Sequence, residues 1–116
     1  MRTDQLIVPG LAVFLLAQTV RPPLAKADDP LTIEVTIKDH QFAPAEIHVP
    51  AGKPVILRIT NADSTAEEFD SSALKVEKVI AGGMYGTVRL RPLGAGRYPF
   101  MGEYHSQTAK GVVVSE

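Results

Sequence analysis

The sequence predicts an all-β protein, a Greek-key β-sandwich or barrel of about seven strands. Short runs of alternating apolar and polar residues recur at a spacing of roughly 8–12 residues from Leu31 onward. Turn-forming residues separate these runs, and the chain holds 9 Gly and 9 Pro to supply them. The apolar period of a helix does not persist for two turns in this region, although residues 71–74 are compatible with one short turn.

Each expected strand is justified by its own alternation and by the turn that ends it. In the first strand, the positions from Leu31 to Ile37 alternate strictly between aliphatic residues and threonine or a charged residue. Pro50-Ala51-Gly52 ends the second strand, Gly82-Gly83 separates the fourth from the fifth, and Gly94-Ala95-Gly96 precedes the sixth. The seven expected strands are 31–38, 45–49, 55–60, 75–80, 87–91, 97–101 and 111–115.

One tract supports the sandwich in particular. Tyr98 stands just inside the sixth expected strand, shortly after the glycine-bearing turn. A tyrosine at this place can fold its hydroxyl back onto the loop backbone and hold the corner of the sandwich. The architecture is therefore well supported, but it says little about function.

The first 27 residues are typical of an export signal. Arg2 supplies a short positive start, and the apolar stretch 6–17 has the length of a signal peptide and falls short of a membrane span. Ala25-Lys26-Ala27 then provides the small-residue pattern for cleavage. We expect a signal peptide at 1–27 and one domain at 28–116, exported to the periplasm. An uncleaved membrane anchor is the alternative.

Composition excludes several classes of function. Twelve Lys and Arg against thirteen Asp and Glu give a formal charge of −1, so a basic surface for nucleic acid is not expected. The chain has no cysteine, which removes disulfides, thiolate catalysis, zinc fingers, iron–sulfur clusters and the sulfur ligand of a blue copper centre. It contains no Gly-x-Ser-x-Gly elbow, and it is too short to build a sugar-binding cleft around two carboxylates.

Three segments interrupt the strand pattern and carry the concentrated polar chemistry: 39–44, 61–72 and 101–110. Loops at one end of a sandwich cluster in space, so residues that are far apart in sequence can meet there. Imidazole and carboxylate are the strong metal ligands that are left without thiolate, and a site of mixed nitrogen and oxygen donors suits Cu(II). The candidate ligands are His40, Glu67, Glu68, Met101, Glu103 and His105.

Each candidate also has an ordinary structural interpretation. A histidine in a loop is more often a surface residue than a ligand, and adjacent acidic residues such as Glu67 and Glu68 usually form a solvated turn. A methionine at a strand end, like Met101, is more often part of the packing. His48 falls on the polar side of its strand and is expected to be ordinary surface. Because no compact motif such as His-Glu-x-x-His is present, spacing alone leaves the metal site undecided.

Separated motifs resemble those of the cupredoxin-like domain family across most of 31–114. The family's opening motif is similar to residues 42–55 (FAPAEIHVPAGKPV), and its ligand loop, Tyr-x-Phe-x-Cys-x-x-His, is similar to residues 98–105 (YPFMGEYH). The departures concern the ligands. Gly102 stands at the cysteine position, Ala109-Lys110 at that of the axial methionine, and Glu67 or Glu68 at that of the first histidine. Only His105 is left of the usual set, so a blue copper centre is not expected.

The altered pattern resembles a narrower group, the small periplasmic cupredoxin-like proteins of bacterial ferrous-iron uptake. Three stretches carry this likeness: 38–47 (KDHQFAPAEI), 67–80 (EEFDSSALKVEKVI) and 100–111 (FMGEYHSQTAKG). The resemblance implies a protein that binds copper, and iron transiently, and that acts by electron transfer or Fe(II) oxidation. Its implied partners are a membrane iron permease and a second periplasmic protein of the P19 type. We expect no nucleic-acid partner, and a monomer or weak dimer.

The resemblance also implies a geometry for the site. In the family, the residue two positions before the Phe-x-Pro motif lies at the rim beside the ligand histidine, and here that residue is His40. The hypothesis is that His40 and His105 approach each other. Glu68 and Glu103 would complete a Cu(II) site whose affinity falls below about pH 6, as imidazoles take up protons. Glu77 is less favoured, because it belongs to an expected strand and can simply face solvent.

The competing interpretation is a metal-free sandwich that serves as a binding or assembly module for a membrane transporter. In that case His40 and the acidic residues would contact the partner protein rather than a metal ion. Composition and spacing do not distinguish the two interpretations, because an interface and a metal site both use exposed polar loops.

Overall fold

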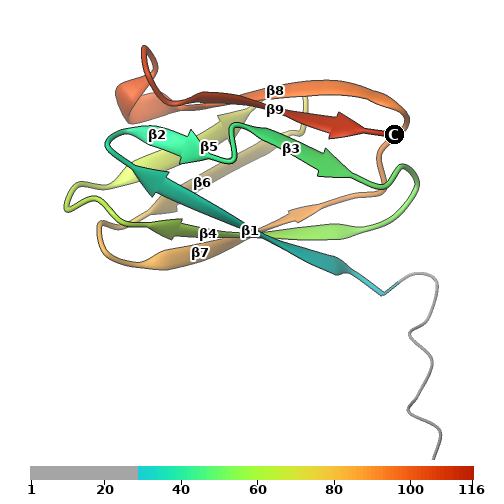
Figure 1. Cartoon of the computed structure of the whole chain (residues 1–116), viewed down its shortest axis with the longest axis horizontal. Helices are drawn as coiled ribbons and strands as arrows, with labels where there is room; N and C mark the ends of the chain where they lie inside the picture. Colours follow the sequence, from blue (N-terminus) through green and yellow to red (C-terminus); the bar gives the residue numbers. More distant parts are fainter. Residues whose placement is uncertain (1–28) are drawn as a thin grey trace, which may run out of the picture.

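Residues 29–116, the part of the chain that the computed structural model describes, form nine strands and one short 3-10 helix. The strands make two sheets that face each other as a sandwich (Figure 1), with the orders β2-β1-β4-β7 and β3-β9-β8-β5-β6. The predicted all-β sandwich is therefore confirmed. The elements are β1 (Leu31–Lys38), β2 (Gln41–Ala43), β3 (Glu46–Val49), β4 (Val55–Asn61), β5 (Glu67–Ser71), β6 (Val76–Ile80), β7 (Tyr85–Leu90), β8 (Gly96–Gly102), η1 (Glu103–His105) and β9 (Lys110–Ser115).

The chain passes repeatedly between the two sheets. It leaves the first sheet after β2, places β3 in the second, and returns to the first with β4. As a result β1 pairs in parallel with β4, and β3 pairs in parallel with β9, whereas the other paired strands are antiparallel. This exchange between sheets is the behaviour of a Greek-key sandwich, and it collects the loops at two opposite ends.

Two of the strands lie in segments that the sequence pattern assigned to loops. β2 falls within 39–44 and β5 falls within 61–72, so the expected count of about seven strands is too low. In β5, the side chains of Glu67, Phe69 and Ser71 are buried and the residues between them are partly exposed. A strand that buries a glutamate and a serine does not show the apolar alternation by which strands are recognised in a sequence. The other seven strands are found with boundaries that differ by at most two residues from those expected.

The core lies between the inward faces of the two sheets. Three phenylalanines from β2, β5 and β8 contact one another, with ring centroids 4.9 Å apart for Phe42 and Phe100 and 4.8 Å apart for Phe69 and Phe100. Phe69 and Phe100 stand two positions from Glu67 and Gly102, respectively, so the aromatic cluster underlies that end of the sandwich. Buried aliphatic residues fill the remainder: Val35, Ile37, Ile47, Val49, Val55, Leu57, Ile59, Leu74, Ile80, Val88, Leu90, Leu93 and Val113.

At the end of the sandwich near the C-terminus, hydrogen bonds and ion pairs hold a loop and the last residue against the sheets. The Tyr98 hydroxyl donates a hydrogen bond to the carbonyl oxygen of Gly94 at 2.9 Å, which confirms the predicted corner. His48 is exposed, as expected, and its ring nitrogens lie near the carboxylates of Glu46 and Glu116. These contacts tie the chain end to the sheet surface.

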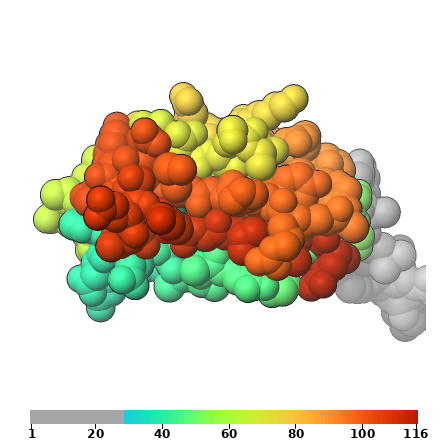
Figure 2. All heavy atoms as spheres, turned by 90° about the horizontal axis from the view of Figure 1, so that it is seen from above, coloured from blue at the N-terminus to red at the C-terminus, as the bar shows by residue number. Residues whose placement is uncertain are grey.

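The opposite end gathers the three segments that carry the polar chemistry. They are the β1–β2 turn, the β4–β5 loop and the segment from η1 to β9, which lie together at the left of Figure 1. Figure 2 shows the orange-red atoms of the η1 segment beside the cyan-green atoms of the β1–β2 hairpin at the same end. The fold thus brings the expected site segments together.

The export signal predicted at 1–27 lies outside the described residues and stays a prediction. Within 29–116, no helix is long and apolar enough to cross a membrane.

Candidate metal centre

A two-residue turn between β1 and β2 carries His40. Asp39 and His40 have φ angles of 52° and 58°, the left-handed backbone of a tight hairpin turn, which Asp and His adopt more readily than most residues. Asp63 closes this turn, because its Oδ1 accepts the Asp39 N–H at 2.8 Å and its Oδ2 accepts the His40 N–H at 2.9 Å. The Thr108 hydroxyl donates to the carbonyl oxygen of His40 at 2.8 Å. The backbone of His40 is therefore held from two sides.

Asp63 is itself positioned by the buried side chain of Asn61. The Asn61 side-chain oxygen accepts the Asp63 N–H at 3.0 Å, and its amide donates to the carbonyl oxygens of Thr65 and Ile80. The hydrogen bond from the His40 N–H is the main cause that holds the pKa of Asp63 below its ordinary value of 3.8, and the His40 and His105 side chains act in the same direction. Asp63 thus places a negative charge next to the two histidines.

His105 ends helix η1 and is oriented by a buried carboxylate. Its Nδ1 lies 2.6 Å from Oε2 of Glu67, whose side chain is 1% exposed. The other carboxylate oxygen of Glu67 accepts the N–H of Tyr104 at 2.9 Å and that of Glu68 at 3.1 Å. A carboxylate in this position can only accept, so in neutral His105 we assign the hydrogen to Nδ1, and Nε2 keeps a free lone pair.

The rings of His40 and His105 lie face to face, and we call them the histidine pair. Their centroids are 3.6 Å apart and their planes differ by 11°. The lone pair of an imidazole nitrogen lies in the plane of its ring, so two nearly parallel rings do not direct their lone pairs at one point. One ring must turn before both can bind a single ion. The hydrogen bonds described above hold the backbone of His40, so its ring can turn without breaking them.

Gly102 stands where the family resemblance expects a cysteine, and it packs directly against Glu67. A Cβ atom at this position would lie 2.5 Å from Cδ of Glu67, closer than real Cβ contacts allow. Glycine is therefore required here because the buried carboxylate of Glu67 and the Cβ atom of Ala109, which would lie 2.7 Å away, occupy the space of a side chain.

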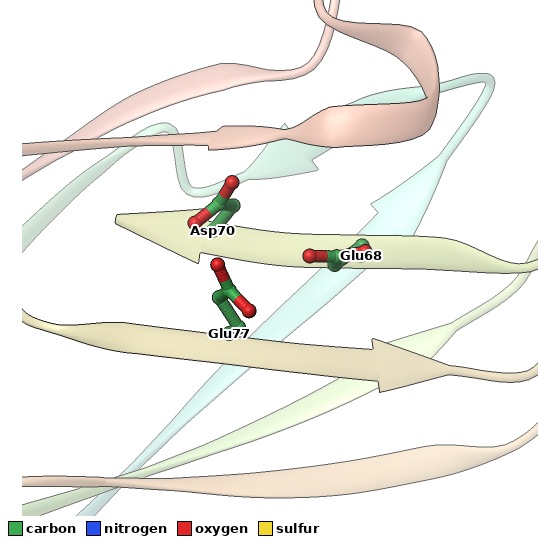
Figure 3. Close-up of side chains that lie close together, drawn as sticks. All are labelled: Glu68, Asp70 and Glu77. Atoms are coloured by element: carbon green, nitrogen blue, oxygen red, sulfur yellow. The ribbon is translucent and has the colours of Figure 1, made fainter. Parts of the chain in front are cut away.

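A second cluster of ionisable residues lies on the outer face of β5 and β6. The carboxylate oxygens of Glu68, Asp70 and Glu77 come within 4.8 Å of one another, and Figure 3 shows those of Asp70 and Glu77 pointing toward each other. Repulsion from Asp70 is the main cause that raises the pKa of Glu103 above its ordinary value of 4.5, with smaller contributions from Glu68 and Glu77. We call these four residues the acidic group. In the part of the chain that is described, its three strand residues are the one set of three ligand-type side chains packed this closely.

The residues expected to form one site therefore divide between two regions. His40 and His105 lie together, and Glu67 joins them through His105. Glu68 and Glu103, which were expected to complete the same site, instead interact with Asp70 in the acidic group. Glu77, the less favoured candidate, belongs to that group as well.

Met101 lies opposite Asp70 in the pairing of β8 with β5 and is 40% exposed, so it borders the acidic group. The role of each of these residues as a metal ligand stays a prediction.

Sequence reasoning missed Asp63 and the packing role of Gly102, and it placed Asp70 in the polar segment 61–72 without counting it among the candidate ligands. Asp70 follows Glu68 by two positions, so recognising β5 as a strand would have placed both on one face. The Asn61-x-Asp63 pattern is a turn signal, since short polar side chains accept hydrogen bonds from the backbone two residues on. The contact between Gly102 and Glu67 has no local signal, because it joins two strands that are distant in sequence.

Known proteins are similar to this chain in sequence and in structure. Residues 6–115 match the model of the Cupredoxin-like domain. An uncharacterized protein of Rickettsia prowazekii (strain Madrid E) is 36% identical over 104 residues, which cover 90% of this chain and 83% of that protein.

Two solved copper proteins share the fold. One is the metal-binding domain of the Cu(I)-exporting P-type ATPase CopA of Streptococcus pneumoniae with Cu(I), with a TM-score of 0.65 and 20% identity, covering 73% of this chain and 84% of that chain. The other is auracyanin A, a "blue" copper protein of Chloroflexus aurantiacus, with a TM-score of 0.63 and 19% identity, covering 76% of this chain and all of that chain. The family match spans nearly the whole sequence, and the chain therefore belongs to the cupredoxin-like domain family.

Proposed function

We propose that this protein is a periplasmic copper-binding protein that supports ferrous-iron uptake. The observation that carries the proposal is the histidine pair, two imidazoles stacked at 3.6 Å with the Nδ1 atom of His105 bound to the buried carboxylate of Glu67. The copper proteins among the similar structures support the choice of metal. The role in iron uptake and the place in the periplasm rest on the narrower sequence resemblance and on the expected export signal.

The donor atoms around the histidine pair fit Cu(II) and do not fit a blue copper centre. The chain has no cysteine, and Glu67 fills the space beside Gly102 in which a thiolate ligand would stand. Imidazole nitrogens suit Cu(II), which has the highest affinity of the common divalent metals for such donors. In this proposal His40 and His105 hold the ion.

Glu67 has a separate task in this arrangement. A carboxylate that accepts the N–H of a ligand histidine fixes the tautomer and the orientation of the ring. Glu67 does this for His105 through the 2.6 Å contact with Nδ1, which leaves Nε2 as the nitrogen that binds. Asp63 and Thr108 hold only the backbone of His40, which leaves its ring free to turn toward the ion.

The proposed substrate is Fe(II). Copper, when bound, would supply a one-electron acceptor for the oxidation of Fe(II) to Fe(III), with dioxygen as the final acceptor of the electron. The acidic group lies next to the histidine pair along the chain, because Glu68 follows Glu67 on β5 and Glu103 begins the helix that His105 ends. Clustered carboxylates create a negative potential that raises the local concentration of divalent cations. The proposed partners are a membrane iron permease and a second periplasmic protein.

Titration of the purified protein with Cu(II), followed by EPR and thermal unfolding, tests copper binding. We expect one Cu(II) per chain, a signal of nitrogen and oxygen ligands, and a Tm that rises with free copper concentration. His40→Ala and His105→Ala should each lower the affinity about 10- to 100-fold, which is roughly 1–3 kcal/mol. Glu77→Gln is the matched control, since it removes a carboxylate from the acidic group and should keep wild-type affinity. Wild-type affinity in both histidine variants would show that the histidine pair does not hold the ion, and a wild-type protein that binds no Cu(II) would favour the metal-free assembly module.

The redox part of the proposal needs a separate measurement. We expect the copper-loaded protein to accelerate Fe(II) oxidation under air relative to the same protein without copper, and His105→Ala to remove most of that acceleration. Equal rates with and without copper would leave a copper-binding protein that has no Fe(II) oxidase activity. Fe(II) uptake by cells that lack the protein then tests the link to transport, and unchanged uptake would argue against it.

A further inference from the structure

We propose that the contact between Glu67 and Gly102 determines which class of metal ion the His105 centre accepts. The carboxylate of Glu67 excludes a thiolate at position 102 and holds the Nδ1 hydrogen of His105. As a result, only nitrogen and oxygen atoms are left to bind a metal ion at this centre. The choice of metal rests on the proposed function, but the contact is a property of the metal-free protein.

Position 102 has no room for a side chain larger than that of glycine. A Cβ atom at position 102 would lie 2.5 Å from Cδ and 2.8 Å from Oε1 of Glu67, and 2.7 Å from the Cβ atom of Ala109. Real Cβ atoms essentially never come within 3.0 Å of such neighbours. Glu67 is 1% exposed and Ala109 is fully buried, so neither has free space into which to withdraw. The carboxylate of Glu67 and the Cβ atom of Ala109 therefore fill the volume that a side chain at 102 would need.

Three hydrogen bonds hold the carboxylate of Glu67 in this place. Its Oε1 accepts the N–H groups of Tyr104 and Glu68, and its Oε2 lies 2.6 Å from Nδ1 of His105. Moving the carboxylate aside would break these three hydrogen bonds, which is costly because the carboxylate of Glu67 is buried and has no access to water. A side chain at 102 and a carboxylate at 67 therefore exclude each other.

The consequence for metal choice follows from ligand chemistry. Thiolates prefer soft ions such as Cu(I), whereas imidazole and oxygen donors suit Cu(II) and other divalent ions. By excluding a thiolate, Glu67 removes the soft ligand that the family resemblance places beside the histidine. By accepting from Nδ1, it leaves Nε2 of His105 free to bind. Glu67 acts here as a positioning residue, through His105 and through the space it fills.

Glu67→Gln in the full protein keeps the shape of the side chain and tests whether Glu67 holds the hydrogen on Nδ1 of His105. The glutamine oxygen should keep the two backbone N–H groups, so its NH₂ group faces Nδ1 of His105 and can only donate to it. We expect ¹⁵N NMR of the metal-free protein to show His105 as the Nδ1–H tautomer in the wild type and as the Nε2–H tautomer in the variant. Cu(II) affinity should fall about 10- to 100-fold. A folded E67Q protein with the wild-type tautomer would overturn the proposal.

A stability cycle on the metal-free protein tests the steric role. All variants carry Ala109→Gly, which removes the second close contact, so that the two nearest neighbours left are atoms of Glu67. We expect Gly102→Ala to lower the Tm when Glu67 is present, and to lower it much less when Glu67→Ala is present as well. An equal loss of Tm in both backgrounds would show that the two positions are independent and would contradict the proposal.

Introducing a cysteine in the same Ala109→Gly background tests the choice of metal. We expect Gly102→Cys combined with Glu67→Ala to give an intense visible thiolate band with Cu(II) and tighter binding of Cu(I). Gly102→Cys with Glu67 in place should give neither. A thiolate band from the variant that keeps Glu67, or none from the variant that lacks it, would overturn the proposal. If the wild-type protein fails to bind Cu(II), the proposed function fails, yet the tautomer and the stability cycle still decide whether the contact acts as described.

Discussion

Glu67 and Glu68 are neighbours on β5 and lie in opposite environments. Glu67 is buried between the sheets, where its carboxylate meets three hydrogen-bond donors. Glu68 lies on the outer face among the carboxylates of Asp70 and Glu77. The period of two in a β-strand separates them, since successive side chains point to opposite faces of a sheet. One short acidic run therefore supplies both an ordered site and a region of like charge.

The two regions also shift carboxylate pKa values in opposite directions. Near the histidine pair, donated N–H groups lower the pKa of Asp63. In the acidic group, the repulsion of Asp70 raises the pKa of Glu103. Within residues 29–116, every buried side-chain nitrogen or oxygen has a hydrogen-bond partner. The ionised carboxylate is therefore stabilised by its neighbours at Asp63 and destabilised by them at Glu103.

The largest expected effect on stability comes from truncating Glu67, the buried residue of the two neighbouring glutamates on β5. Glu67→Ala should lower the free energy of unfolding by about 3 kcal/mol, because it leaves partly buried donors without their acceptor and opens a cavity in place of a buried side chain. Glu68→Ala is the matched control on the same strand and should change it by no more than about 0.5 kcal/mol. Urea unfolding of the metal-free proteins measures both. Similar losses in the two variants would remove the distinction between the faces of β5.

An intermediate effect is expected at Asp63. Because its pKa is lowered in the folded protein, its contribution to stability is present above the ordinary pKa of 3.8 and is lost as the pH falls through the lower folded-state value. Asp63→Ala should therefore lower the Tm near neutral pH and have little effect in strong acid. Asp39→Asn, in the same turn, is the control and should not show this pH dependence. A Tm difference for Asp63→Ala that does not vary with pH would contradict the assignment.

The smallest effect is expected in the acidic group, and it has the opposite sign. Because the pKa of Glu103 is raised in the folded protein, the associated stability is present below its ordinary pKa of 4.5 and is lost as the pH rises through the folded-state value. Glu103→Gln should therefore raise the Tm slightly near neutral pH and leave it unchanged well below pH 4.5. Salt at about 1 M should reduce the gain by screening. A lower Tm at neutral pH would show that Glu103 is not repelled by its neighbours.

Much of the fold could be predicted from local patterns. Alternation identified the strands whose inward residues are aliphatic, and the turn before Tyr98 identified the corner that its hydroxyl bonds to. The pattern failed at β5, where Glu67 and Ser71 occupy buried positions. A buried polar residue is stable only with partners from elsewhere in the chain, and those partners are invisible to a local period.

The amino-acid sequence was enough to establish an all-β sandwich and to exclude a thiolate centre, because strand periodicity and the absence of cysteine are local or compositional facts. Through the family resemblance, the sequence also predicted that His40 and His105 lie close together. The remaining contacts are set by the tertiary structure alone. The rings of His40 and His105 stack, Glu67 faces His105 and packs on Gly102, and Glu68 belongs to the acidic group. These relations depend on strand pairing across the sheet and on loop closure, which join residues that no local pattern relates to one another.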